Sequence, residues 1–245
     1  MKKRLLSATI CLVPIVLLFA LTGCPNDGKI SDRLKDEYMQ KVNAVLDDFF
    51  SQDSYRTVMD DGMENDCTFS YHKRDGIVTA AVEYPSYGYP HNGPLYYHGG
   101  LTFYPQSDQY LSRVQEEGFE IWHTSNPIYV KKDIPAPDSV YETKDGKEIS
   151  LRYSEKNAAL NVYHAYCYWH GRGPNPSNVY GVTKTIHLSE EGKLESIIFC
   201  VYYMRLDWET QKEKKHEYVV VFKCFSDTGK INIDERAKHL FDDYD

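Results

Sequence analysis

Two short stretches of the chain carry side chains of the kinds that bind metal ions. His164-x-x-Cys167-x-x-His170 offers imidazole and thiolate ligands that suit zinc, and residues 60–66 are rich in carboxylates, which suit calcium. If the first stretch is a strand, its side chains alternate, so Cys167 points away from both histidines. The second stretch lacks the ligand spacing of a helix–loop–helix calcium site. We therefore expect no metal and no cofactor.

The 245 residues contain none of the common catalytic motifs. The chain lacks a Gly-x-Ser-x-Gly elbow, a His-Glu-x-x-His motif and a glycine-rich phosphate-binding loop. Asp227-Thr228-Gly229 matches the tripeptide of aspartic proteases, but that chemistry needs two carboxylates that share a proton, and the chain has one copy. The sequence therefore favours a non-catalytic protein, with an enzyme that lacks any recognisable motif as the alternative.

Residues 84–105 are unusually rich in tyrosine, and also contain four prolines and four glycines. Proline and glycine disfavour a long helix and a regular strand alike, whereas tyrosine combines a broad apolar face with a polar tip. Such residues are favoured at recognition surfaces. We expect a ligand-binding surface here and in a second aromatic stretch, residues 163–170. The residues expected to form this surface are Tyr84, Tyr87, Tyr89, Tyr96, Tyr97, Tyr104 and Trp169. Packing of these rings over the sheet is the alternative.

Four cysteines outside the first 24 residues could form two disulfides. A register that places Cys200 opposite Cys224 also brings apolar residues of both segments together on one face, as antiparallel strands require. The second pair, Cys67 and Cys167, then follows by elimination. Four buried free thiols are the alternative.

The elements that must position these residues are a helix followed by strands. Apolar residues recur at helical spacing from Ser31, a plausible N-cap, to about Gln52. Segments near 77–84, 148–153 and 182–188 alternate apolar and polar residues, as strands do, and residues 107–117 look helical. We predict an α+β fold, with the N-terminal amphipathic helix packed on a curved antiparallel up-and-down β-meander. A closed β-barrel with a flanking helix is the alternative.

The first 24 residues form an export signal. Three cationic residues precede an uncharged apolar stretch that ends in Leu21-Thr22-Gly23-Cys24. This ending resembles the lipobox of bacterial lipoproteins. The resemblance implies that residues 1–23 are removed, that Cys24 receives lipid, and that the protein is anchored to a membrane of the bacterial cell envelope. Residues 24–30 would be a short lipidated tether, and residues 31–245 a single domain.

Net charge narrows the class of partner. The full chain has 36 acidic and 28 basic residues, and removal of residues 1–23 takes away three of the basic ones, which leaves a net charge of −11. Nucleic-acid binding needs a cationic surface and is not expected. We expect a non-catalytic recognition module for a protein or a glycan. A carrier that holds a small apolar ligand in a barrel cavity is the first alternative, and the enzyme is the second.

Overall fold

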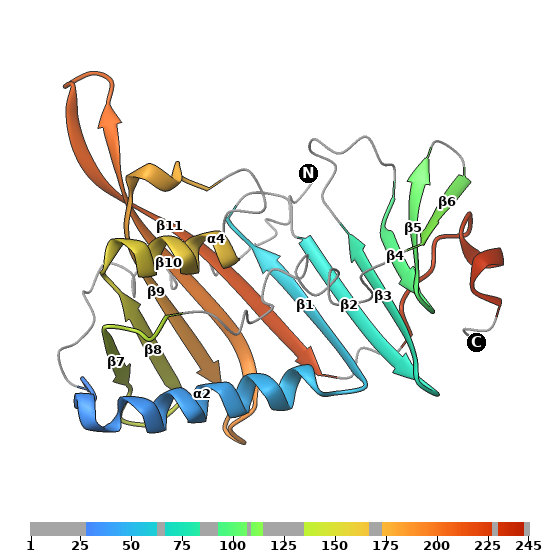
Figure 1. The fold of residues 1–245 in the computed structure, drawn as a ribbon, viewed down its shortest axis with the longest axis horizontal. Helices are drawn as coiled ribbons and strands as arrows, with labels where there is room; N and C mark the ends of the chain where they lie inside the picture. The colour runs from blue at the N-terminus through green and yellow to red at the C-terminus, as the bar shows by residue number, and fades with distance from the viewer. Residues whose placement is uncertain are drawn as a thin grey trace, which may run out of the picture.

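A computed structural model describes residues 28–62, 67–83, 93–106, 109–114, 135–166, 173–226 and 230–242. Eleven strands in these ranges form one antiparallel sheet (Figure 1). Its strands are β1 (Ser54–Asp60), β2 (Cys67–Arg74), β3 (Ile77–Glu83), β4 (Leu95–His98), β5 (Leu101–Gln106), β6 (Gln109–Val114), β7 (Ser139–Glu142), β8 (Glu148–Tyr153), β9 (Val179–Leu188), β10 (Leu194–Asp207) and β11 (Lys212–Ser226). The prediction of an α+β fold on an antiparallel meander is confirmed at this level.

The sheet consists of two meanders that meet at its centre. Strands β1 to β6 follow one another toward one edge, and β7 to β11 return from the other edge, so the order is β6-β5-β4-β3-β2-β1-β11-β10-β9-β8-β7. The central pairing joins β1 to β11, with Thr57 opposite Cys224. The outer strands β6 and β7 lie at opposite edges, so the described sheet is open and the alternative of a closed barrel is wrong.

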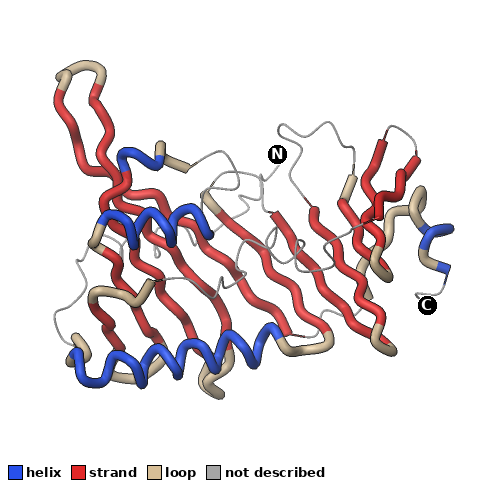
Figure 2. Tube along the Cα trace, viewed as in Figure 1, coloured by secondary structure: helices blue, strands red, loops and turns tan. Residues whose placement is uncertain are grey.

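The N-terminal helix forms because its apolar residues fall on one side. Helix α2 (Lys35–Phe50) buries Val42, Leu46 and Phe49, which are spaced at four and three residues. It begins later than predicted, because a short 3₁₀ turn, η1 (Asp32–Leu34), follows Ser31, whose side chain makes no capping hydrogen bond. Helix α2 runs across one face of the sheet (Figure 2) and shares that face with α4 (Lys156–Tyr166).

Two segments differ in secondary structure from the prediction: one is a helix instead of a strand, and the other is a strand instead of a helix. Residues 156–166 form α4, whereas the stretch that begins at His164 was interpreted as a strand, and residues 109–114 form β6 instead of a helix. The helix is explained by burial: Ala159, Val162 and Tyr163 pack against the sheet at helical spacing, with Tyr163 Oη donating to Pro174 O at 2.5 Å. Side-chain spacing alone did not separate a short helix from a strand here.

A second, smaller core lies on the opposite face of the sheet. The C-terminal segment, residues 230–242, packs Ile231, Ala237 and Phe241 against β3, β4, β5 and β6. It includes the 3₁₀ turn η4 (Lys238–Leu240). The Phe241 ring lies 5.3 Å from that of Tyr96 and 5.5 Å from that of Phe103. This segment therefore covers the part of that sheet face formed by β3 to β6.

The predicted disulfide between Cys200 and Cys224 is wrong. In the observed register Cys200 lies opposite Val219, five residues from Cys224. Because five is odd, the two cysteines also point to opposite faces of the sheet. Cys67, Cys200 and Cys224 form no disulfide, so Cys67 is not bridged either, and Cys167 lies outside the described residues. Burial raises the pKa of the Cys67 and Cys224 thiols to about 12.

None of the helices within the described ranges is both long and apolar enough to cross a membrane. Cys24 and the preceding apolar stretch lie outside those ranges.

Candidate binding site: an arm with an aromatic stripe

The most exposed apolar side chains sit on a hairpin that extends beyond the rest of the sheet. Strand β10 pairs with β9 only as far as Tyr203, which lies opposite Val179, and then continues against β11 alone to Asp207. The outer part of this hairpin, residues 204–215, is called the arm below. It projects as a two-stranded ribbon from the end of the sheet (Figure 1). A ribbon without a covering layer keeps both of its faces accessible.

One side of the arm and its root carries a row of apolar and aromatic residues. Tyr202, Met204 and Leu206 alternate along β10 and therefore point to the same side, about 7 Å apart. The Tyr180 ring of β9 lies 6.3 Å from the Tyr202 ring, and Lys215 Nζ lies 5.9 Å from the Tyr180 ring. We call Tyr180, Tyr202, Met204 and Leu206 the aromatic stripe. The stripe leads toward Trp208 at the tip.

The tip holds Trp208 in water on a well-defined turn. Trp208 is 78% exposed, and Leu206 is 55% exposed. Asp207 Oδ1 accepts hydrogen bonds from the backbone N–H of Glu209 (3.1 Å) and Thr210 (2.9 Å), and the Gln211 side chain donates to Trp208 O at 2.7 Å. The Lys214 ammonium and these N–H groups hold the pKa of Asp207 below its ordinary value, so its carboxylate stays ionised and keeps these bonds. Because the turn is already ordered, the backbone at Trp208 loses little conformational entropy when the side chain binds a partner.

The predicted tyrosine surface is not formed by the residues that the structure describes. Tyr96 is fully buried and Tyr97 is 6% exposed, so the prediction is wrong for both; Tyr104 is half-buried. Tyr96 Oη donates to Asn232 O at 3.2 Å and accepts from the N–H of Asp234 at 2.8 Å. Tyr84, Tyr87, Tyr89 and Trp169 lie outside the described residues.

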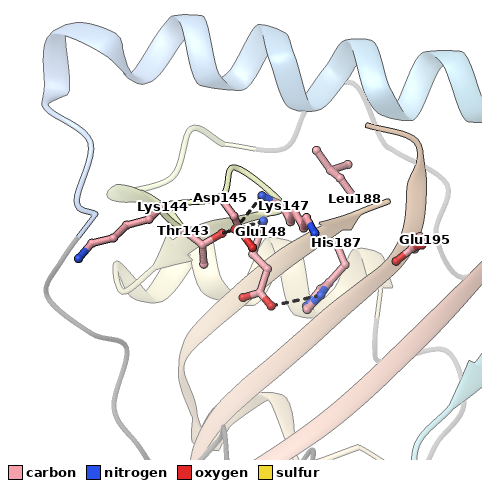
Figure 3. A pocket seen from close by; sticks show the side chains of 8 residues that line it. All are labelled: Thr143, Lys144, Asp145, Lys147, Glu148, His187, Leu188 and Glu195. Atoms are coloured by element: carbon pink, nitrogen blue, oxygen red, sulfur yellow. Dashed lines mark hydrogen bonds and ion pairs between the residues drawn. The ribbon is translucent and has the colours of Figure 1, made fainter. Parts of the chain in front are cut away.

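A second candidate is an open hollow of about 600 Å³, whose lining side chains are drawn in Figure 3. It includes Glu195, near the start of β10, whereas the arm lies at the end of that strand. Its lining combines both charges, and His187 Nδ1 lies 3.4 Å from Glu148 Oε1. Thr143 Oγ1 donates to Asp145 Oδ1 at 2.6 Å, and Lys147 pairs with Glu190. These polar groups bind one another along the turns after β7 and β9, and their arrangement points to stable turns more than to a reaction.

The two stretches with side chains of metal-binding types are only partly described. In the described ranges no three His, Cys, Asp or Glu side chains are grouped so that they could hold a metal ion. Asp60 Oδ1 accepts a hydrogen bond from the Gly62 N–H at 2.9 Å, and Asp60 Oδ2 lies 3.3 Å from Lys223 Nζ, so this carboxylate holds a turn and pairs with a lysine. Cys167, His170 and the tripeptide at 227–229 lie outside the described residues.

The arm is not among the elements predicted from the sequence. The sequence does contain a signal for it, since Met204, Leu206 and Trp208 alternate with Arg205 and Asp207. The register predicted for Cys200 and Cys224 places these apolar residues on the packed face of the sheet, because the apolar face of a strand usually covers a core. In the structure the alternation runs past the edge of the core and into water.

No family model and no curated protein matches this chain.

Proposed function

We propose that this chain is a bacterial cell-envelope lipoprotein, anchored by acylated Cys24, that acts as a non-catalytic recognition module. Its contact surface is the arm, with the aromatic stripe and Trp208, and its partner is a protein or a glycan. The exposure of Trp208 at the end of the arm carries the proposal. Tryptophan and tyrosine dominate the binding energy of recognition surfaces, because they bury a large apolar area at a low cost in conformational entropy.

The described residues do not support the carrier alternative, because their sheet is open and an open sheet does not enclose a barrel cavity. The hollow in Figure 3 is open and lined mainly by charged side chains, which does not suit an apolar ligand. Recognition by an exposed surface needs neither an enclosed cavity nor a catalytic group.

The test is site-specific photocrosslinking in intact envelopes. A photoreactive residue at Leu206, on the arm, should form an adduct with one partner, whereas the same residue at the exposed Glu191, at the other end of the sheet, should not. Adducts at both positions, or at neither, would count against the arm as the contact surface.

Trp208→Ala should reduce the adduct formed at Leu206 and weaken binding to the identified partner by about 2 kcal/mol, or about thirtyfold in affinity. The free energy of unfolding should change by less than about 0.5 kcal/mol, because the side chain is 78% exposed. Titration by calorimetry and urea unfolding would measure the two quantities. Trp208→Phe should retain part of the affinity, and unchanged affinity in Trp208→Ala would contradict the proposal.

Cys24→Ser should release the protein from the membrane fraction, since lipid attachment needs the thiol. Two acyl chains give a stable anchor, whereas the mature chain, with its net charge of −11, has no electrostatic attraction to anionic lipids. Fractionation of envelopes by flotation checks the prediction. Cys200→Ser is the matched control and should stay in the membrane fraction.

A further inference from the structure

The segment that follows the lipidated cysteine is docked against the sheet edge. The Ile30 N–H donates to Val140 O at 2.8 Å, the Glu142 N–H donates to Gly28 O at 3.1 Å, and Lys29 forms an antiparallel bridge with Tyr141. Residues 28–30 thus add a short strand to β7, the outermost strand on this side. Much of the expected tether is therefore part of the folded body, and only residues 25–27 separate it from Cys24.

Helix α2 and the backbone of Gly28 hold this edge in place. Glu142 accepts hydrogen bonds from Tyr38 Oη at 2.5 Å and from Lys41 Nζ at 2.7 Å. Gly28 has a φ of +139°, and a Cβ atom there would lie 2.3 Å from Glu142 O. A side chain at position 28 would therefore separate the docked segment from β7.

Covalent reach then limits where the anchoring bilayer can be. The Cα atom of Cys24 lies within about 14 Å of that of Gly28, since four extended residues span no more. Gly28 lies beside Glu142. Glu142 is paired with Ile149, Ile149 with Ile186, and Ile186 with Ile197 of β10, so all four lie at the same height along the strands. Trp208 is eleven residues further along the hairpin, or about 36 Å. The anchor and the tip of the arm therefore lie at opposite ends of the strands.

We infer that the bilayer that holds Cys24 lies against the end of the sheet formed by residues 28–30, β7 and the 143–147 turn, and that the arm points away from it toward a partner that stands off from that bilayer. This inference rests on the proposed acylation of Cys24.

Energy transfer in vesicles tests this orientation. The acylated full-length mature protein is reconstituted in phosphatidylethanolamine–phosphatidylglycerol vesicles that contain an acceptor-labelled lipid. A fluorescent amino acid replaces either Lys144, beside the docked segment, or Glu209, at the tip; both side chains are exposed. Transfer to the acceptor lipid should be at least about twofold higher from position 144, given a difference of about 36 Å along the strands. Equal transfer, or higher transfer from position 209, would overturn the inference.

Two variants test the cause of the orientation. A flexible insert of roughly twenty Gly and Ser residues between Asp27 and Gly28 should remove most of the difference in transfer, because the body can then rotate over the bilayer. Gly28→Val should reduce the difference as well, because it undocks the segment, and an unchanged difference in both variants would overturn the role of docking.

If neither labelled protein floats with the vesicles, acylation itself fails and the proposed function fails with it. Flotation with equal transfer refutes the orientation alone.

Discussion

Truncation of Tyr96 to alanine should lower the free energy of unfolding by roughly 3–5 kcal/mol, as for other large aromatic residues in a core. The ring is fully buried and lies 5.3 Å from Phe241 and 5.5 Å from Tyr110. Its hydroxyl group also bridges two backbone groups of the C-terminal segment, at Asn232 and Asp234. Tyr96 therefore joins β4 to the segment that forms the smaller core.

Urea unfolding of the two matched variants separates these contributions. Tyr96→Phe keeps the ring and loses only the bridge, so its loss of stability should be about 1–3 kcal/mol. Tyr180→Ala removes an exposed tyrosine and should cost less than about 1 kcal/mol. A loss below about 1 kcal/mol for Tyr96→Ala would show that the ring is not part of a core, and would restore the interpretation of an exposed tyrosine surface.

The tyrosines show what composition can and cannot predict. Their number identified an unusual segment, but a phenol can serve equally as a core ring with a satisfied hydroxyl group or as a contact surface. Which role applies to Tyr96 depends on a segment more than 130 residues further along the chain, since residues 230–242 cover it. No local pattern around position 96 contains that information.

The fold was predictable in its elements and less so in their pairing. Alternation located β3, β8 and β9, and helical spacing located α2, because both patterns depend on near neighbours. The junction of β1 with β11 depends on residues about 165 positions apart and left no local signal. The register of β10 and β11 was predicted five residues away from its true position, because matching apolar residues assumes that both strands end within the core. The charged arm breaks that assumption.

Replacement of Lys184 with methionine should stabilise the protein at neutral pH and remove a pH dependence that the wild type has. Lys184 is 4% exposed on β9, on the covered face of the sheet, with its Nζ atom 5.9 Å from the Phe199 ring. Burial lowers the pKa of this ammonium group to about 8 from an ordinary value of 10.5. Between these two pH values the unfolded chain binds more protons at this site than the folded chain, so wild-type stability rises with pH across that window.

At pH 7 the Lys184→Met variant should therefore be more stable than the wild type. The difference in their free energies of unfolding should decrease by about 3 kcal/mol as the pH rises from 7 to 10.5. Taking the difference between the two proteins cancels the titration of the buried thiols and tyrosines, which both contain. Urea unfolding at several pH values between 7 and 9.5 follows most of the window.

Lys184→Arg stays charged throughout and should be less stable than the wild type at every pH. The exposed Lys193→Met should give a curve parallel to the wild type. A parallel curve for Lys184→Met as well would mean that the Lys184 ammonium group is not desolvated in the folded protein.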